Sequence, residues 1–247
     1  MEVVYEDNHI IIVSKSSGEI VQGDKTGDVP LSETVKEYLK EKYHKPGNVF
    51  LGVVHRLDRP VSGLVVMART SKALSRLNKM FAEGQVHKTY WAVVAGGTAD
   101  GYDDGGTPWQ EVTHWLTRNE QQNKSYAHQH QITGAKQARL RFRQLAATER
   151  YRLLEVELMT GRHHQIRCQL SAMGMPIRGD LKYGARRSNP DGSISLLSHR
   201  VEFVHPVSGQ HIVALASLPQ GDALWQALVR AASPNVPVGD DPGHRVQ

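Results

Sequence analysis

The sequence predicts an α+β fold in which helices and loops flank a large, mixed and mainly antiparallel sheet. Residues 63–69 are almost continuously aliphatic, as in a strand that is covered on both faces. Residues 151–159 alternate apolar and charged side chains with the period of a half-buried strand. Residues 199–205 and 211–215 flank the turn sequence P-V-S-G and favour a hairpin. Mostly strands with a few interposed helices are typical of this fold class.

The remaining elements follow from turn signals and helical periodicity. Further strands are predicted over residues 9–13, 86–95 and 138–142. Helices are predicted over residues 31–43, from 70 or 71 to Gly84, over 161–173, and from Asp222 to about 232. The expected N-caps are Ser32, Thr70 or Ser71, and Asp222, because their side-chain oxygens can accept first-turn N–H groups.

Two stretches lack a regular pattern. From residue 96 to about 134 the apolar content drops while Gly, Asp, Asn and Gln accumulate, so we expect a long surface excursion with a short element around Trp109–Leu116. Residues 233–247 are rich in Pro, Gly and charge and predict a mobile tail. The expected organisation is one domain over residues 1–232 followed by this tail.

Composition narrows the class of protein. The 247 residues, 39% of them hydrophobic, can bury one substantial core. Thirty Lys and Arg against 25 Asp and Glu give a net charge of +5, which favours a polyanionic partner. The single cysteine, Cys168, excludes an intramolecular disulfide and a zinc site of paired cysteines. No apolar stretch reaches about 18 residues and no leader is visible, so we expect a cytoplasmic protein.

The most informative segment is residues 55–63, which read H-R-L-D-R-P-V-S-G and carry Asp58. This carboxylate lies between two arginines in a loop that opens the buried strand at 63–69. A loop gives access, and a buried strand gives rigidity. The pattern therefore indicates an active-site loop.

A second segment, residues 87–90, begins the strand at 86–95 and reads H-K-T-Y. On a period of two, Lys88 and Tyr90 share a face. Without further context, a surface lysine and a packed core tyrosine are the favoured explanation, because most tyrosines in strands only pack against their neighbours.

The third segment, residues 160–167, reads T-G-R-H-H-Q-I-R. If it is helical, His163, Ile166 and Arg167 share an apolar stripe with Leu170, whereas Arg162, Gln165 and Gln169 point elsewhere. A buried guanidinium needs an anion, so we expect Arg167 to face a carboxylate. The alternative is an Arg167 that extends to solvent.

Four histidines invite a metal-site interpretation: His163, His164, His128 and His130. Adjacent helical positions point about 100° apart, so His163 and His164 cannot both face one ion. The i, i+4 spacing of a zinc-protease helix is also absent. We therefore expect no metal, and expect His164 to contact phosphate or to hold a loop.

Together the three segments resemble the motifs of the RluA-type RNA pseudouridine synthases, H-R-L-D-x-x-T-S-G-L, K-x-Y and T-G-R-x-H-Q-I-R. Residues 176–184 and 197–209 resemble two further motifs of that family, P-I-x-G-D-x-x-Y-G and L-x-H-A…F-x-H-P-x-x-G. The sequence departs from the family pattern at Val61, Gln169 and Arg200, where threonine, histidine and alanine are usual. The resemblance covers roughly residues 1–218 and is far more specific than any one motif.

The resemblance implies a pseudouridine-synthase-like fold that isomerises specific uridines to pseudouridine in ribosomal or transfer RNA. Asp58 is implied as the nucleophile, Tyr90 as the ring against the uracil and Arg167 as the partner of Asp58. A neighbouring guanidinium favours the charged carboxylate, so we expect Asp58 to be ionised at neutral pH. Whether it attacks the ribose, attacks the ring or removes a ribose proton stays open. No cofactor is expected.

RNA is the expected partner, with no membrane and no metal. A stacked uridine cannot reach Asp58, so we expect the nucleotide to flip into the site, with His55 or Arg56 filling the vacated space. The residues expected to contact RNA are His55, Arg56, Arg59, Lys88, Arg162, His164, Gln165, Ile166, Lys182 and Leu197. The chain begins almost at once with the sheet, so no extra N-terminal RNA-binding module is expected. Oligomeric state stays open, with a monomer as the expectation.

Two other classes of function compete with this hypothesis. A non-catalytic RNA-binding factor on the same fold would be expected to have lost Asp58, Tyr90 or Arg167, and none is lost. A hydrolase of small nucleosides would need a closed pocket without basic surroundings, and the arginines beside Asp58 argue against it.

Overall fold

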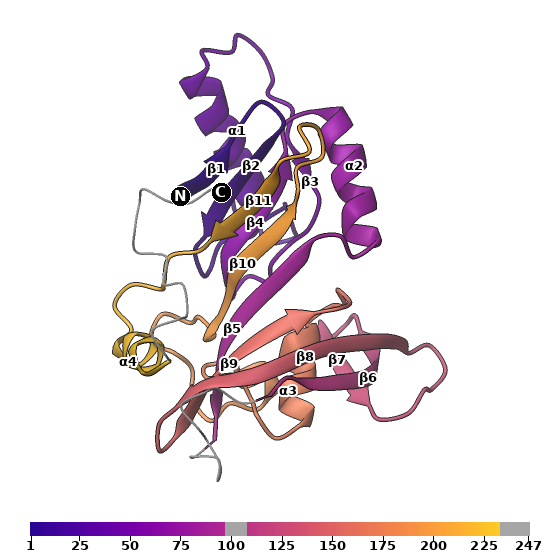
Figure 1. Ribbon diagram of the computed structural model, residues 1–247, viewed down its shortest axis with the longest axis vertical. Coiled ribbons are helices and arrows are strands. Elements are labelled where there is room, and N and C mark those ends of the chain that lie inside the picture. The colour runs from indigo at the N-terminus through magenta and orange to yellow at the C-terminus, as the bar shows by residue number, and fades with distance from the viewer. Residues whose placement is uncertain (97–107, 233–247) are drawn as a thin grey trace. The chain divides into compact units, whose positions relative to one another are not determined.

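The computed structural model describes residues 1–96 and 108–232 (Figure 1). The chain divides into two compact units, each of which has its own core. The described part of unit 1 comprises residues 1–87 and 198–217, and that of unit 2 comprises residues 88–96, 108–197 and 218–232. The predicted tail and the first part of the predicted excursion lie outside the described residues. The expectation of one domain over 1–232 stays a prediction.

Unit 1 holds two helices and most of the N-terminal strands. Its strands are β1 (Glu2–Glu6), β2 (Ile10–Lys15), β3 (Gly52–Val53), β4 (Ser62–Ala68), most of β10 (Leu196–Val204) and β11 (His211–Leu215). Its helices are α1 (Leu31–Lys42) and α2 (Ser71–Ala82). The strand order is β1-β2-β4-β10, with β11 paired to β10 and β3 paired to β4.

The core of unit 1 lies at β2 and β4, which are antiparallel neighbours. Residues 10–13 and 64–68 have no exposed surface at all. This confirms the prediction of a strand covered on both faces, since side chains on both sides of the pleat are buried. Helix α2 packs against β3 and β4 (Figure 1) and contributes Ala73 and Leu77 to the core.

Unit 2 contains a second run of strands and the shorter helices. Its strands are β5 (His87–Ala95), β6 (Gln110–Asn119), β7 (Lys124–His128), β8 (Lys136–Ala147) and β9 (Tyr151–Leu158). Its helices are α3 (Gln165–Ala172), the 3₁₀ turn η1 (Leu181–Tyr183) and α4 (Ala223–Ala231). The order is β5-β9-β8-β6-β7, and each of these neighbouring pairs is antiparallel.

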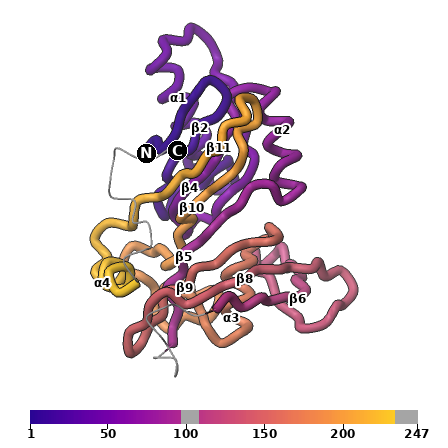
Figure 2. The backbone as a smooth tube through the Cα atoms, in the orientation of Figure 1, coloured from indigo at the N-terminus to yellow at the C-terminus, as the bar shows by residue number. Residues whose placement is uncertain are grey.

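The alternation predicted along residues 151–159 is confirmed in β9. Val156 is buried, while Glu155 and Glu157 lie on the other face and pair with arginines of β8. Arg141 meets Glu157 at 2.6 Å and Arg143 meets Glu155 at 2.5 Å. The two strands run side by side along most of their length (Figure 2). The predicted fold class, an α+β fold on a large mixed and mainly antiparallel sheet, is confirmed.

The predicted excursion over residues 96–134 is the main departure. The described part of it forms the antiparallel hairpin β6–β7, which continues the sheet through β8. The inward positions of this hairpin include His114, Leu116 and Ser125, all buried. Because two of these three are polar, the segment has a low apolar content although one of its faces is buried.

The helix starts agree with the predicted caps in two of three cases. Thr70 accepts the N–H of Ala73 at 3.2 Å, and Asp222 accepts that of Leu224 at 3.0 Å. The predicted cap Ser32 is wrong, because α1 begins one residue before it and Pro30 holds the N-cap position. The first N–H groups of α1 instead donate to the backbone carbonyls of residues 20 and 21, so no side-chain cap is needed.

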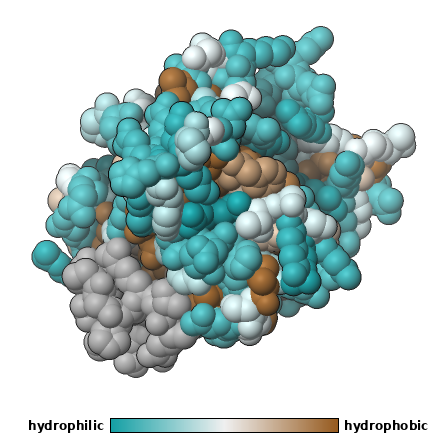
Figure 3. Space-filling view, turned by 90° about the horizontal axis from the view of Figure 1, so that it is seen from above, coloured by the Kyte–Doolittle hydropathy of each residue, from teal (hydrophilic) through white to brown (hydrophobic). Residues whose placement is uncertain are grey.

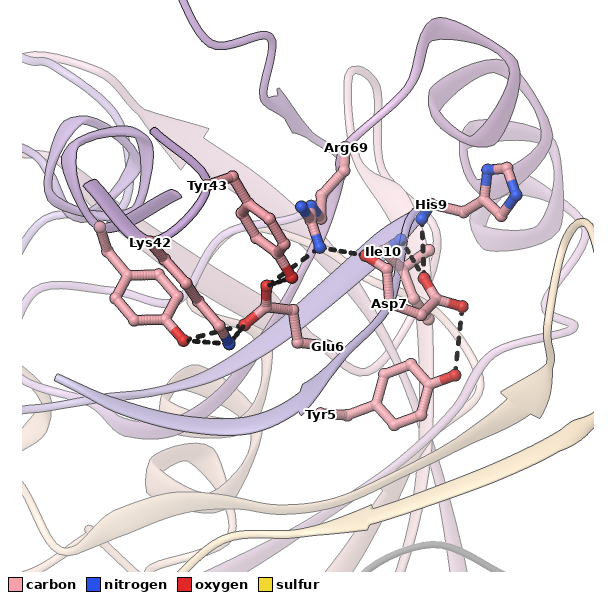
Figure 4. Close-up of polar contacts among 9 residues, drawn as sticks. Tyr5, Glu6, Asp7, His9, Ile10, Lys42, Tyr43 and Arg69 are labelled. Carbon is pink, nitrogen blue, oxygen red and sulfur yellow. Dashed lines mark hydrogen bonds and ion pairs between the residues drawn. The ribbon is translucent and has the colours of Figure 1, made fainter. Parts of the chain in front are cut away.

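A cluster of polar side chains joins β1, α1 and the end of β4 (Figure 4). The Glu6 carboxylate accepts from Lys42 at 2.8 Å, Tyr43 at 2.6 Å and Arg69 at 3.0 Å, and the Tyr38 hydroxyl donates to it at 2.9 Å. Burial would raise the pKa of Glu6, but hydrogen bonds from Lys42, Tyr43 and Tyr38 hold it below its ordinary value. The cluster fixes the C-terminal end of β4.

The face seen in Figure 3 is largely hydrophilic, with hydrophobic residues scattered over it. Such isolated apolar residues are usual on a protein surface. Within residues 1–96 and 108–232, no helix has the length and apolar character needed to span a bilayer.

Gly63 marks a close approach between β4 and β10. Its φ is +112°, and a Cβ there would lie 2.3 Å from the carbonyl oxygen of Ser198. Only glycine combines this backbone conformation with so near a neighbour. The approach matters for the site because Gly63 follows the loop that carries Asp58.

We predict that Gly63→Ala lowers the free energy of unfolding by about 3 kcal/mol, because the added methyl group meets backbone atoms and the conformation is strained. Urea unfolding followed by circular dichroism measures the change. Gly47→Ala is the matched control, since a Cβ at Gly47 meets nothing within 4 Å. Equal stability of the two variants would contradict the prediction.

Candidate active site

Asp58 lies in the loop of residues 54–61, between β3 and β4, which we call the Asp58 loop. Its side chain is half-buried, while Arg56 two residues earlier is exposed. Leu57 anchors the loop in the core with 8% of its surface exposed. The N–H of Val61 donates to the carbonyl of Asp58 at 3.0 Å and closes a turn. The carboxylate is thus held by a fixed backbone and stays accessible.

The Asp58 loop is held by Lys15, a residue that the motif analysis missed. Lys15 ends β2 and is only 1% exposed. Its ammonium donates to the carbonyls of Val61 at 2.7 Å and Arg59 at 3.1 Å, both within this turn, and to that of Ser16 at 2.8 Å. A lysine buried in this way is kept because three backbone acceptors satisfy its three N–H groups.

The electrostatics of Lys15 connect it to Asp58. Burial lowers the pKa of Lys15 to about 8, while the negative charges of Glu19 and Asp58 act in the opposite direction. Asp58 therefore lies close enough to Lys15 for their charges to interact. A lysine at the end of an apolar strand gives no sequence signal for this, because most such lysines extend into solvent.

Two other predicted residues of the Asp58 segment, His55 and Arg59, have partners within unit 1. The His55 ring accepts the N–H of Val66 at 2.9 Å through Nε2 and stacks on Phe81 with 4.8 Å between ring centroids. Arg59 pairs with Asp28 at 2.6 Å and with Asp24 at 3.5 Å. His55 thus braces β4 and α2, and Arg59 holds the loop at residues 24–28.

Tyr90 and Lys88 lie on β5, where the sequence predicts them. Tyr90 is 6% exposed and lies opposite Val156 in the register with β9. Lys88 is half-buried, and desolvation lowers its pKa. Their shared face agrees with the period of two.

The segment at residues 160–167 differs from the predicted helix. Helix α3 begins at Gln165 rather than at Gly161, and its N-cap His164 has a left-handed conformation with φ 51°. His163 therefore precedes the helix and is not part of its apolar stripe. Gln165 and Gln169, which we expected to point away from this stripe, are also buried, at 3% and 0% exposed. Residues 165–170 of α3 are all buried, so this helix does not have the one buried and one exposed face that the periodicity argument assumes.

Arg167 is buried, as predicted, and faces a carboxylate. Its Nε lies 2.7 Å from Oδ2 of Asp180, and its Nη2 lies 2.9 Å from Oδ1. Both side chains are almost fully buried, at 6% and 1% exposed. The alternative of an Arg167 that extends to solvent is wrong. Sequence reasoning missed Asp180 as a partner, although the residue lies inside a quoted family motif.

His164 is held by Tyr183. The Tyr183 hydroxyl accepts the N–H of Ser125 at 2.8 Å and is also hydrogen-bonded to Nδ1 of His164 at 2.9 Å. Burial lowers the pKa of His164 to about 2 and raises that of Tyr183 to about 12, so both side chains are neutral at pH 7. His164 is 8% exposed, which favours the loop-holding role over a phosphate contact.

The remaining predicted contact residues fall into two groups. Ile166 and Leu197 are buried, at 4% and 1% exposed. Arg162 and Lys182 are exposed, and both bind backbone carbonyls: Arg162 that of Gln137 at 3.0 Å, and Lys182 that of Gln122 at 3.1 Å.

Gln165 holds the loop that precedes α3. Its side-chain oxygen accepts from Thr160 at 2.8 Å and from the N–H of Arg162 at 2.9 Å, while its Nε2 donates to the carbonyl of Arg139 at 3.0 Å. These contacts make Gln165 a brace of the loop, and its contact with RNA stays a prediction.

The structure therefore assembles the predicted residues in two sets. Unit 1 holds Asp58 with His55, Arg56 and Arg59, and unit 2 holds Tyr90, Lys88 and the residues around α3. The pairing of Asp58 with Arg167 would join the two units and stays a prediction. Among the described residues, no group of three or more His, Cys, Asp or Glu side chains is arranged to bind a metal ion.

Two solved structures share the fold. The human protein titled RNA Pseudouridylate Synthase Domain Containing 4 superposes with a TM-score of 0.70 at 18% identity, covering 94% of this chain and 92% of that one. Human RNA Pseudouridylate Synthase Domain Containing 1 gives 0.62 at 21% identity, covering 95% and 96%. At this level of identity the likeness defines the class of fold, that of the pseudouridine synthases.

Residues 9–172 match the family described as RNA pseudouridylate synthase, and this match spans more than half of the chain. The protein belongs to this family, and the resemblance to its RluA-type members is confirmed.

Curated relatives agree. The tRNA pseudouridine synthase C of Pectobacterium carotovorum is 31% identical over 252 residues, which cover 93% of this chain but 61% of that protein. The ribosomal large subunit pseudouridine synthase D of Xanthomonas campestris is 31% identical, covering 89% of this chain and 66% of the relative. The chain thus spans less than two thirds of each of these two proteins. The tRNA pseudouridine synthase C of Vibrio parahaemolyticus is 29% identical, with 92% and 93% covered.

We predict that Lys15→Met lowers the free energy of unfolding by roughly 3 kcal/mol, because three backbone carbonyls lose their donor. Thermal unfolding measures the loss, with Lys72→Met, an exposed lysine of α2, as control. A Lys15→Met protein as stable as the control would show that the ammonium does not hold the loop.

The difference in stability between the wild type and Lys15→Met should also depend on pH, which thermal unfolding at several pH values measures. The pKa of Lys15 is about 8 in the folded chain against 10.5 ordinarily, so between these values the unfolded chain binds more protons. The stability of the wild type relative to Lys15→Met should therefore rise as the pH increases from about 8 to about 10.

Proposed function

We propose that the protein is an RNA pseudouridine synthase, an isomerase that converts specific uridines of ribosomal or transfer RNA to pseudouridine. The observation that carries the proposal is the setting of Asp58. Its side chain is half-buried on a loop whose backbone carbonyls are hydrogen-bonded to the buried Lys15 ammonium. Membership of the family and the names of the relatives, which refer to transfer RNA and to the large ribosomal subunit, support the substrate class.

In the proposed reaction the bond from ribose to the ring nitrogen breaks, the uracil turns, and a carbon–carbon bond forms between the ribose and carbon 5. The proton on carbon 5 then leaves. No net oxidation occurs, and all atoms of the product other than an exchanged proton come from the substrate. The step needs a carboxylate beside the reacting centre, as in retaining glycoside chemistry, and we assign Asp58 as this nucleophile.

Tyr90 is assigned to the uracil. Its backbone is fixed in the middle of a sheet by the pairing of β5 with β9, and its side chain is a flat, largely apolar ring. A neutral phenol is a poor base at pH 7, so stacking explains its presence better than proton abstraction.

Arg167 is assigned as the counter-charge of Asp58. A guanidinium carries five N–H groups, and Asp180 engages the edge formed by Nε and Nη2. A guanidinium held in this way can donate to a second carboxylate through its remaining N–H groups. This agrees with the role that the family motif implies for Arg167, that of partner to Asp58.

RNA is proposed to enter with the target uridine flipped out of its stack. The exposed cations Arg56, Arg162 and Lys182 suit contacts with phosphate groups, because their charges lie at the surface. His55 has a bracing role within unit 1, which makes Arg56 the better candidate for filling the space that the flipped base leaves.

We predict that Asp58→Asn reduces pseudouridine formation at least about a thousandfold, because the amide cannot act as a nucleophile. Tritium release from RNA labelled at carbon 5 of uridine measures turnover, with Asp191→Asn, a surface loop variant, as control. Full turnover by Asp58→Asn would refute the assignment.

The same assay distinguishes the proposed synthase from the two competing classes of function. Wild-type protein that releases free uracil instead of tritium would be a hydrolase, and one that binds the RNA without either release would be a non-catalytic RNA-binding factor.

We predict that Arg162→Gln weakens RNA binding and reduces the slope of log affinity against log salt concentration by about 0.7, because one phosphate contact is lost. Filter binding at several salt concentrations measures the slope. Arg230→Gln, in the exposed part of α4, is the matched control. An unchanged slope would rule out Arg162 as a phosphate contact.

A further inference from the structure

We propose that Asp180 is a positioning residue for catalysis: its carboxylate fixes the plane and orientation of the Arg167 guanidinium, and it acts on turnover only through Arg167. The inference rests on the proposed function, because the orientation of Arg167 affects turnover only if the protein forms pseudouridine.

The first support is the geometry of the contact. Two nearly parallel hydrogen bonds join Arg167 and Asp180, at 2.7 Å through Nε and at 2.9 Å through Nη2. A bidentate pair of this kind fixes the guanidinium plane, whereas a single bond would let the group rotate. Neither side chain is more than 6% exposed, so water does not compete for these donors.

The second support is the rigidity of the segment that carries Asp180. The N–H of Arg178 donates to the carbonyl of Val93 on β5 at 2.8 Å, and the N–H of Ala185 donates to the carbonyl of Asp180 at 3.0 Å. Gly179 has φ +88°, and a Cβ there would lie 2.6 Å from the carbonyl oxygen of Ser193. The backbone before and after Asp180 is therefore fixed to the sheet and to its own turn.

The third support is the ring of Tyr183. The centre of the Arg167 guanidinium lies 5.1 Å from the centroid of this ring, within the range of a cation–π contact. Hydrogen bonds to Ser125 and His164 fix the hydroxyl end of the same ring. Arg167 is thus held at one edge by a carboxylate and over one face by an aromatic ring.

The charge of Asp180 explains why Arg167 can stay in place before RNA arrives. An isolated guanidinium in the interior would be strongly unfavourable, so it needs a permanent counter-ion. Asp180 supplies one from within unit 2. Because Asp180 is 1% exposed, it cannot itself be a phosphate contact. Its loss should therefore affect turnover and leave RNA affinity nearly unchanged.

The test compares Asp180→Asn with the wild type. Single-turnover tritium release from cellular RNA labelled at carbon 5 of uridine should fall between about tenfold and a hundredfold, as misplaced catalytic groups do. The affinity for the same RNA, measured by filter binding, should stay within about twofold. A merely structural role would not produce this separation.

A double-variant cycle tests whether Asp180 acts through Arg167. In an Arg167→Lys background, Asp180→Asn should cost less than about threefold further turnover, since the orienting contact is already lost. Asp222→Asn is the matched control, because it breaks another arginine–aspartate pair of unit 2, that with Arg178. It should lower stability and leave turnover near that of the wild type.

Asp180→Glu serves if Asp180→Asn does not fold, as thermal unfolding would reveal. This variant keeps the negative charge but displaces the carboxylate by one methylene group, so turnover should fall while RNA affinity is retained. Three outcomes would overturn the inference. A folded Asp180 variant could show wild-type turnover, the losses in the double-variant cycle could be additive, or weaker RNA binding could explain the whole loss of turnover. An inactive wild type would instead refute the proposed function.

Discussion

The buried guanidinium of Arg167 is the constraint on which the site in unit 2 depends. A charge of this kind cannot stay inside a protein without a partner, and the surrounding residues meet that requirement. Asp180 balances it, Gly179 permits the backbone conformation that places Asp180, and Tyr183 covers one face. These contacts give the guanidinium a fixed orientation, which a group on a mobile loop would lack.

Unit 1 also contains a buried cation, and it is stabilised by a different kind of partner. Lys15 is also a buried cation, but its partners are backbone carbonyls of the Asp58 loop instead of a carboxylate. Its charge therefore fixes a backbone turn, and the turn presents Asp58. Each unit thus contains a buried cation in a fixed position: Lys15 holds the Asp58 loop in unit 1, and Arg167 is itself held by Asp180 in unit 2.

Local patterns predicted much of this. The aliphatic run of β4, the alternation in β9 and the caps Thr70 and Asp222 depend on near neighbours in the sequence, so the pattern reveals them. The family motifs pointed to Asp58 and to a buried Arg167.

What the sequence missed depends on distant partners or on single backbone angles. Lys15 looks like a surface lysine until the carbonyls 44 and 46 residues further on are placed around it. The late start of α3 follows from the left-handed conformation of His164, which hydrophobic periodicity does not register. The partner of Arg167 lies 13 residues away, beyond a turn.

We propose that the Asp58 carboxylate performs chemistry on uridines in RNA. A nucleotide-resolution map of pseudouridines in cells, with the wild-type gene and with Asp58→Ala, tests it most directly. At least one pseudouridine present with the wild-type gene should be absent with the variant and should return when the wild-type gene is restored. Identical maps, with both proteins present at equal levels, would contradict it.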